Sequence, residues 1–262
     1  MGDAIGLHLL PHIDLVATPR RSVIARLDPG GGLVSHETAA DDGAILDRIG
    51  RHGAGPTVVD APLEVPNAEG RRDVEAVLAW CDIAAFPVSR RRLEVVFGGA
   101  RGVDLAPALS EGGRRAVEAL PDQVLRQLIW EARHPRDAAP IALADYRAAW
   151  LGVRAPRYRP KGAGRARTQG ILEAWRLLAD VIDMDGWAPE ATPVDDWSAI
   201  NDAARIDALC CAYAGLRLAD PRTGLVLGAP GLGQVALPAD ANLRERLSAT
   251  LDRLRDEGAI AI

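Results

Sequence analysis

Three aspartates stand in apolar surroundings, where an ionised carboxylate is costly to bury unless a cation meets it. Asp14 lies within "HIDLV", Asp60 follows the apolar run "PTVV", and Asp207 lies within "RIDALCCAYAG". On a helix, Asp207 shares an apolar stripe with Ala204 and Cys211, so its side chain is expected to point with the buried face. Each aspartate is therefore a candidate for an ion pair or for a metal ligand.

Two interpretations of these acids remain open. Taken singly, a strand-end aspartate such as Asp60 is often a turn or cap residue. Asp207 likewise has Arg205 and Arg217 on the same stretch of chain as candidate partners. Taken together, three converging carboxylates repel one another and require cations. Oxygen ligands with no His or Cys nearby favour Mg²⁺ or Mn²⁺, and two such ions about 4 Å apart activate water in phosphodiester cleavage.

The pattern of apolar residues predicts the elements that would bring these acids together. A β-meander precedes a short helix over 41–52, and a central strand ends just before Asp60. Neighbouring strands would place Asp14 beside Asp60 at one edge of the sheet, and a helix from about 195 to 219 would add Asp207. The expected strands of the meander are 13–16, 22–27 and 33–38. A further strand, "RRAVEALP", completes a mixed five-stranded sheet with helices on both faces, which is an α/β fold.

The rest of the chain is expected to form helices and one hairpin around that sheet. Residues 67–113 are irregular and Arg-rich, and we interpret them as a helical insertion within a single domain spanning 1–262. Asp122 is the expected N-cap of the helix "DQVLRQLIWEARH". A Pro-Gly turn predicts a hairpin in "GLVLGAPGLGQVALP", and the amphipathic "NLRERLSATLDRLRDEG" predicts a C-terminal helix.

Composition narrows the class of protein. The net charge is −5 over 262 residues, which excludes a generic polyanion binder, so any nucleic-acid surface must be local. The three cysteines do not make a disulfide framework, which favours reduced thiols and a cytoplasmic location. The chain lacks the basic region of a secretion signal and a run of 18 apolar residues, so we expect neither a leader nor a membrane span.

One local basic segment stands out in this acidic protein. Residues 154–167 contain six cations and no acid, with a tyrosine among them. Such a segment suits a phosphate backbone, and an interleaved aromatic ring can stack on a base. A solvated loop before a helix explains the same composition. The candidate nucleic-acid contacts are Arg157, Tyr158, Arg159, Lys161, Arg165 and Arg167.

Two histidines near the start of the chain give a weaker signal. His8 and His12 stand four positions apart in "HLLPH", which is the spacing of a helical zinc site. Pro11 breaks the helix that such a site needs. We therefore interpret both histidines as turn or surface residues.

The order of these motifs resembles the RNase H-like superfamily, and more specifically the predicted nucleases known as domain-of-unknown-function family 429. The likeness runs over roughly residues 11–240 and rests on "IDLV", "VVDAPLEVP" followed by "GRRD", "VEALP", "YRPKGAGRAR" and "RIDALCCAYAG", in that order. The resemblance implies an RNase H-like fold and a nuclease activity. It also implies that Asp14, Asp60 and Asp207 bind Mg²⁺ or Mn²⁺.

A fourth acid enters through the same resemblance. Glu118 in "VEALP" matches an acidic position that the family favours, and would support a metal directly or through water. A strand-end acid paired with Arg114 or Arg115 is the alternative interpretation of Glu118.

The sequence thus supports functions of different classes. The first is a metal-dependent phosphodiester hydrolase in which Asp14, Asp60, Asp207 and Glu118 are catalytic. The second is a protein of the same fold that binds nucleic acid or a nucleotide with weak or no catalysis, which the lack of a second acid one turn from Asp207 favours. A small-molecule phosphotransferase is a third, which the absence of a Gly-rich loop after the first strand disfavours.

Overall fold

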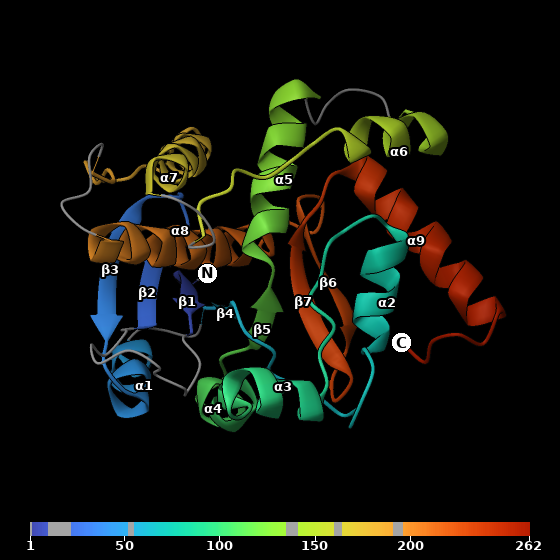
Figure 1. Cartoon of the computed structure of the whole chain (residues 1–262), viewed down its shortest axis with the longest axis horizontal. Helices are drawn as coiled ribbons and strands as arrows, with labels where there is room; N and C mark the ends of the chain where they lie inside the picture. The colour runs from blue at the N-terminus through green and yellow to red at the C-terminus, as the bar shows by residue number, and fades with distance from the viewer. Residues whose placement is uncertain (1, 10–21, 52–54, 135–140, 160–163, 191–195) are drawn as a thin grey trace.

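A seven-stranded mixed sheet forms the centre of the molecule (Figure 1). The computed structural model describes residues 2–9, 22–51, 55–134, 141–159, 164–190 and 196–262. Its strand order is β3-β2-β1-β4-β5-β7-β6. The strands are β1 (Ala4–His8), β2 (Ser22–Leu27), β3 (Leu33–Ala39), β4 (Thr57–Val59), β5 (Ala116–Ala119), β6 (Gly224–Ala229) and β7 (Gly233–Pro238). The expected α/β class is confirmed, but the expected count of five strands is wrong, because the C-terminal hairpin joins the sheet through parallel pairing of β7 with β5.

The first strand differs from the expectation. It is Ala4–His8, whereas the expected strand 13–16 lies outside the described residues. Ile5 and Leu7 point into the apolar cluster on one face of the sheet, and Gly6 points to the other face. The alternation of side chains along a strand explains this division. β2 and β3 complete the antiparallel meander as expected, and β1, β4, β5 and β7 run parallel.

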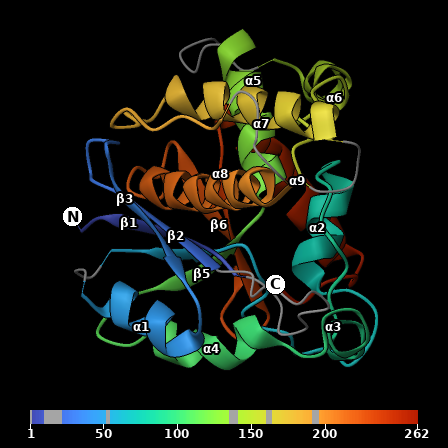
Figure 2. The same cartoon turned by 60° about the vertical axis from the view of Figure 1, so that its left-hand side comes forward.

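One long helix covers the centre of the sheet. α8 (Asp196–Arg217) crosses β1, β2 and β4, and α7 (Gly164–Ala179) and α5 (Pro121–Arg133) pack against it (Figures 1 and 2). α8 approaches β1 unusually closely, because a Cβ atom added to Gly6 would lie 1.9 Å from the carbonyl oxygen of Ala208. A residue without a side chain is therefore required at this crossing. The close approach fixes the height of α8 above the end of β1.

The opposite face and the far end of the sheet carry the other helices. α1 and α4 lie together below β1 and β4, while α2 contacts the β6–β7 hairpin and packs against α9 (Figure 2). α5 begins at Pro121 with Leu120 as its N-cap, so the expected N-cap at Asp122 is wrong, since proline suits the first helical position. The bounds are α1 (Asp42–Gly50), α2 (Asp73–Trp80), α3 (Arg90–Phe97), α4 (Arg101–Leu109), α6 (Leu143–Leu151) and α9 (Ala241–Asp256). The expected insertion 67–113 thus contains α2, α3 and α4.

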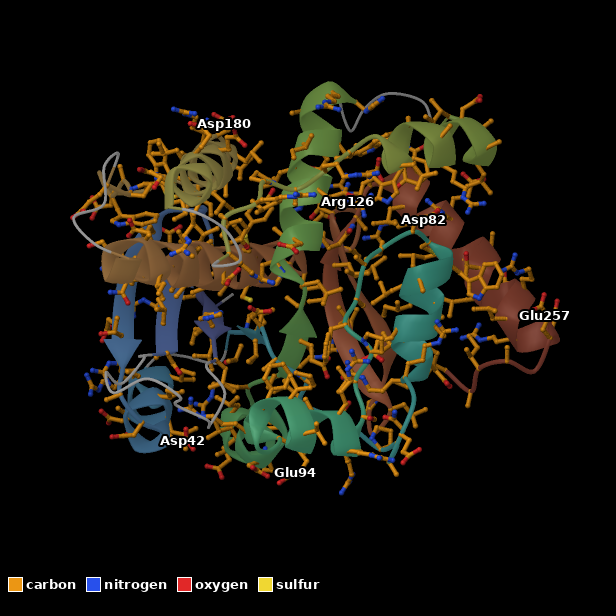
Figure 3. The ribbon with its side chains drawn as sticks, viewed as in Figure 1. Asp42, Asp82, Glu94, Arg126, Asp180 and Glu257 are labelled. Atoms are coloured by element: carbon orange, nitrogen blue, oxygen red, sulfur yellow. The ribbon has the colours of Figure 1, made fainter. Side chains whose placement is uncertain are left out.

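Acids such as Asp180 at the end of α7 and Glu257 after α9 lie at the periphery, where water solvates them (Figure 3). Arg126 instead points inward from α5 and donates to the backbone carbonyl oxygens of Asp82, Trp150 and Val153, which ties α5 to α6.

Within the part of the chain that the structure describes, no helix combines the length and the apolar composition that crossing a membrane requires.

Candidate metal centre

The strand register brings His8 and Asp60 together. β1 and β4 are parallel, with Gly6 beside Val58 and Leu7 beside Val59. The backbone N–H of Asp60 donates to the carbonyl oxygen of Leu7 over 2.9 Å, which continues this pairing past the end of β4. Because side chains alternate along a strand, His8 points to the same face as Gly6, which is the face that α8 covers.

Asp207 reaches the same point from α8. It directly precedes Ala208, whose carbonyl oxygen faces Gly6, and its side chain is 3% exposed. Nδ1 of His8 lies 3.1 Å from Oδ2 of Asp60 and 3.4 Å from Oδ2 of Asp207. One ligand atom from each of these three residues lies within 4.8 Å of the others. The expected convergence of Asp60 and Asp207 is therefore confirmed, and a histidine joins them.

Arg159 supplies a positive charge to both aspartates. Its Nη2 atom is 2.8 Å from Oδ1 of Asp207 and 3.3 Å from Oδ2 of Asp60. The hydroxyl of Tyr158 donates to Oδ1 of Asp207 over 2.5 Å. The partners that the sequence suggested for Asp207 lie elsewhere: Arg205 pairs with Asp202, and Arg217 pairs with Glu131.

The two carboxylates also change the acidity of their neighbours. Burial alone would lower the pKa of His8, but its hydrogen bond to Asp60 and the charges of Asp207 and Asp60 outweigh burial and raise it. Burial likewise opposes the charge of Arg159, while the two aspartates raise the pKa of its guanidinium, which therefore stays ionised. Burial and the charge of Asp207 raise the pKa of Tyr158, which keeps its hydroxyl a hydrogen-bond donor.

Glu118 lies at the same edge of the sheet but points to the opposite face. Its neighbour in the register is Val59, which faces away from α8, whereas Val58 faces α8. Glu118 is bound on that opposite face by Arg72, whose Nη1 and Nη2 atoms lie 2.6 and 2.8 Å from its two carboxylate oxygens. Its cationic partner is thus Arg72 rather than the suggested Arg114 or Arg115.

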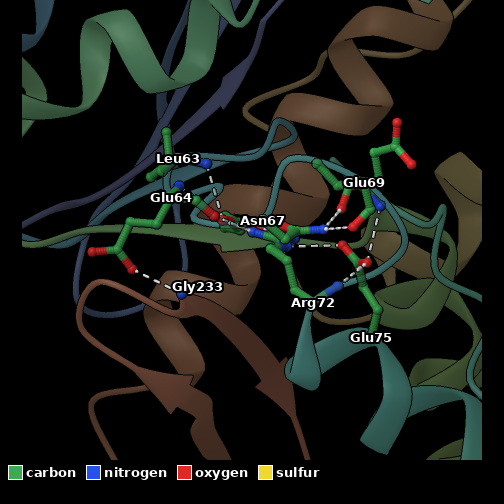
Figure 4. A network of polar contacts seen from close by, with 9 residues as sticks. Leu63, Glu64, Asn67, Glu69, Arg72, Glu75 and Gly233 are labelled. Atoms are coloured by element: carbon green, nitrogen blue, oxygen red, sulfur yellow. Dashed lines mark hydrogen bonds and ion pairs between the residues drawn. The ribbon is translucent and has the colours of Figure 1, made fainter. Parts of the chain in front are cut away.

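Backbone and side-chain groups complete the surroundings of Glu118 (Figure 4). The N–H groups of Leu63 and Glu64 donate to one of its oxygens, and Nε of Arg72 donates to Glu75 over 2.8 Å. Burial alone would lower the pKa of Arg72, but its bonds to Glu118 and the charges of Glu118 and Glu75 raise it. We refer to Arg72, Glu75 and Glu118 as the buried triad. Its contacts hold the loop that leads away from Asp60.

The basic segment is divided between several environments instead of forming one described surface. Tyr158 is 1% exposed, and its hydroxyl donates a hydrogen bond to Asp207. Its ring is therefore not free to stack on a base as expected. Arg159 turns toward the acids, Arg167 is buried, and Arg157 is exposed. Lys161 and the side chain of Arg165 lie outside the described residues, as does Asp14.

His8 is the site residue that the sequence interpretation missed. The spacing to His12 drew attention to a helical zinc site, whereas His8 ends a strand. The signal that identifies it is its place at the tip of "AIGLH", beside the tip of "TVV" in the parallel pair. The first strand of the sheet therefore contributes an imidazole to the site. The candidate metal ligands include this imidazole as well as carboxylates.

A cavity of about 1220 Å³ adjoins these residues. It lies at the carboxyl ends of the parallel strands, where open α/β sheets bind ligands. One end is charged and contains His8, Asp60, Asp122, Arg159 and Asp207. The buried triad also lines the cavity, and the remaining walls are largely apolar and come from the loop before α3, from α3 itself and from α8.

Comparisons with known proteins identified no relative of this chain. A scan against protein-family models found no match, and searches of curated proteins and of solved structures found no significant similarity.

Proposed function

We propose that the protein is a metal-dependent phosphodiester hydrolase that acts on nucleic acid, with His8, Asp60 and Asp207 as the metal ligands. The observation that carries this proposal is the convergence of one nitrogen and two carboxylate oxygens within 4.8 Å, beside a large cavity. The three residues come from two strand ends and a helix, so the set depends on the whole fold and not on one local turn.

The donor set favours Mn²⁺ over Mg²⁺. The sequence suggested oxygen ligands alone, whereas His8 adds an imidazole nitrogen at the site. Magnesium prefers oxygen ligands, whereas imidazole suits transition metals, and Mn²⁺ accepts both carboxylates and nitrogen. Bound there, such an ion would lower the pKa of a water molecule and polarise a phosphoryl oxygen.

Two residues of the chain prepare the site for this role. Tyr158 donates to Asp207 and so fixes the orientation of its carboxylate, as outer-shell partners of metal ligands do. Arg159 neutralises part of the negative charge and competes with any cation for the same oxygens. A guanidinium at the mouth of a phosphodiester site is also placed to bind a phosphate.

Features of the whole molecule support the finer parts of the proposal. The meander β3-β2-β1 followed by parallel β4 and β5 supports an RNase H-like fold with the hairpin as an addition. The exposed Arg157 supports a nucleic-acid partner. The buried free thiols of Cys81, Cys210 and Cys211 agree with a reducing, cytoplasmic location.

The experiment measures hydrolysis of a labelled oligonucleotide with Mn²⁺, with Mg²⁺ and with EDTA. We expect cleavage with Mn²⁺ that is lost in EDTA and in Asp60→Asn, which keeps the size of the side chain. Asp180→Asn is the matched control, since Asp180 is exposed at the end of α7. Equal, metal-independent rates for wild type and Asp60→Asn would refute the proposal.

A second candidate function is binding of nucleic acid or a nucleotide without catalysis. The observation that favours it is the contact of Arg159 with both aspartates, which supplies a cation to the site without a metal. It predicts salt-dependent binding with no metal-dependent turnover. The same hydrolysis experiment, combined with a binding measurement at several salt concentrations, separates the two functions.

A further inference from the structure

The cavity beside the candidate metal centre has two chemically different ends. His8, Asp60 and Asp207 form the charged end. Phe86 and Phe97 line the other end, together with the apolar side chains of Pro87 and Leu93. At about 1220 Å³, the cavity exceeds the usual range of small-molecule sites, roughly 300–1000 Å³, so a ligand of nucleotide size fits within it.

The three candidate ligands at the charged end are recessed below the protein surface. The side chains of Asp207, His8 and Asp60 are 3%, 17% and 19% exposed. A double helix is stiff and carries paired, stacked bases behind its phosphates, so it meets a protein best at an open surface. An unpaired strand bends and separates its bases, which allows one nucleotide to enter a recess. The burial of the ligands therefore favours an unpaired nucleotide.

The apolar end has the features of a base-stacking platform. The Phe86 side chain lines the cavity although the residue is 44% exposed. The ring of Phe97 packs edge-on against the ring of Phe86, with 6.0 Å between the two ring centroids. The guanidinium carbon of Arg92 lies 4.2 Å from the centre of the Phe86 ring. Aromatic rings combined with arginine bind unpaired bases by stacking and cation–π attraction, without strong sequence preference. Tyr158, the aromatic residue expected to stack, is buried and so is not available for this role.

We propose that the site takes an unpaired nucleotide, with its phosphate beside Arg159 and the metal ion that His8, Asp60 and Asp207 would hold, and its base against Phe86. This inference rests on the proposed function and names its substrate class, which is single-stranded nucleic acid in preference to a duplex. Arg92 holds the ring of Phe86 in place, and Phe97 supports it from the side.

The test compares three DNA substrates of equal length: a single strand, a blunt duplex, and a single strand that contains a run of abasic sites. Cleavage with Mn²⁺ is measured for wild type, Phe86→Ala and Phe86→Trp. Val95→Ala is the surface control, because Val95 is 75% exposed on α3 and does not line the cavity. Thermal denaturation verifies that each variant is folded.

For wild type we expect cleavage of the single strand at least about 10-fold faster than of the duplex, because only the unpaired strand offers a free base for stacking. Phe86→Ala should reduce the preference for the base-containing strand over the abasic strand about 10-fold, and Phe86→Trp should retain it. Equal rates on single strand and duplex, or an unchanged preference in Phe86→Ala, would overturn the inference.

Failure of the proposed function is recognised separately. If none of the three substrates is cleaved with Mn²⁺, the hydrolase proposal fails. Fluorescence anisotropy of the same labelled strands then decides the inference by itself. Tighter binding of the single strand than of the duplex, weakened in Phe86→Ala, sustains it, and equal binding of both overturns it.

Discussion

Two groups of ionised side chains lie near the same edge of the sheet, and they differ in how completely their charges are satisfied. In the buried triad, both oxygens of Glu118 accept bonds from Arg72, and backbone N–H groups add to them. At the candidate metal centre, Arg159 is 41% exposed and is shared between Asp60 and Asp207. Both groups line the same cavity, but the side chain of Arg72 is 4% exposed, whereas that of Arg159 is 41% exposed.

The difference teaches that an acid at a strand tip is not by itself a catalytic acid. Asp60 and Glu118 both stand at the ends of neighbouring parallel strands. Asp60 points to the face covered by α8, where the cavity brings it beside other ligands, while Glu118 points to the face where Arg72 is buried. The face, and not the position along the strand, separates the candidate metal ligand Asp60 from Glu118, which belongs to a buried ion pair.

The largest expected effect comes from removing the cation of the buried triad. Arg72→Met leaves Glu118 and Glu75 buried without their partner, since the Arg72 side chain is only 4% exposed. We expect the free energy of unfolding to fall by about 3–5 kcal/mol, as for other broken buried pairs. Urea denaturation measures it. Arg159→Met is the comparison variant and should cost less than Arg72→Met, because the side chain of Arg159 is 41% exposed, so water can replace part of its contact with the aspartates. Similar losses of unfolding free energy in both variants would show that the buried triad and the candidate metal centre do not differ in how their charges stabilise the fold.

The next effect concerns metal affinity. Asp60→Asn removes one charged ligand from the candidate metal centre, and we expect Mn²⁺ affinity to fall about 100-fold, equivalent to about 2.8 kcal/mol. Isothermal titration calorimetry measures the change. Asp202→Asn provides a comparison, because Asp202 is buried on the same helix as Asp207 but pairs with Arg205. An equal loss in Asp202→Asn would show that the affinity responds to general damage of α8.

A smaller effect of opposite sign is expected at Arg159. Its guanidinium shares carboxylate oxygens with any bound cation, so Arg159→Gln should strengthen Mn²⁺ binding about 10-fold, or about 1.4 kcal/mol. The same variant should weaken binding of an oligonucleotide, because a phosphate loses a cationic partner. Weaker Mn²⁺ binding in Arg159→Gln would instead make Arg159 a structural support of the aspartates.

The smallest effect is a pH dependence of stability without metal. The pKa of His8 is raised above its ordinary value of 6.5 in the folded protein by Asp60 and Asp207, so the protonated form stabilises the native state. This contribution is fully present below the unfolded pKa and disappears as the pH rises through the folded pKa. The difference in unfolding free energy between wild type and His8→Gln in EDTA should therefore be larger at pH 5 than at pH 9, by less than about 1 kcal/mol. A difference independent of pH would show that the pKa of His8 is the same in the folded and unfolded protein, and a smaller difference at pH 5 than at pH 9 would show that folded His8 stays neutral.

Local patterns in the sequence identified much of the scaffold and two of the site residues. Asp60 was recognised because it follows the apolar run of β4, and Asp207 because it shares a stripe with buried residues of α8. Both observations depend on short-range periodicity, which survives in any tertiary context.

The remaining site residues depend on pairings between distant segments. The spacing of His8 and His12 and the proline between them predict turn or surface histidines, whereas His8 ends β1 beside β4. The sequence places Glu118 with the other acids, whereas the register with β4 directs it to the opposite face. Tyr158 is expected to stack on a base, whereas its ring is buried and its hydroxyl donates to Asp207, a carboxylate that Arg159 also contacts. None of these relations is encoded in the spacing of neighbouring residues.

The contact between Gly6 and α8 also has a consequence for how the chain reaches its native state. The two partners, Gly6 and Ala208, are about 200 residues apart, so β1 emerges from the ribosome long before the helix that covers it. Contacts of such high sequence separation form late and slow the search for the native topology. Until α8 docks, one face of β1 and β4 is uncovered and open to wrong pairing. The candidate metal centre is complete only once α8 has docked, because Asp207 lies on α8, so metal binding would report that docking.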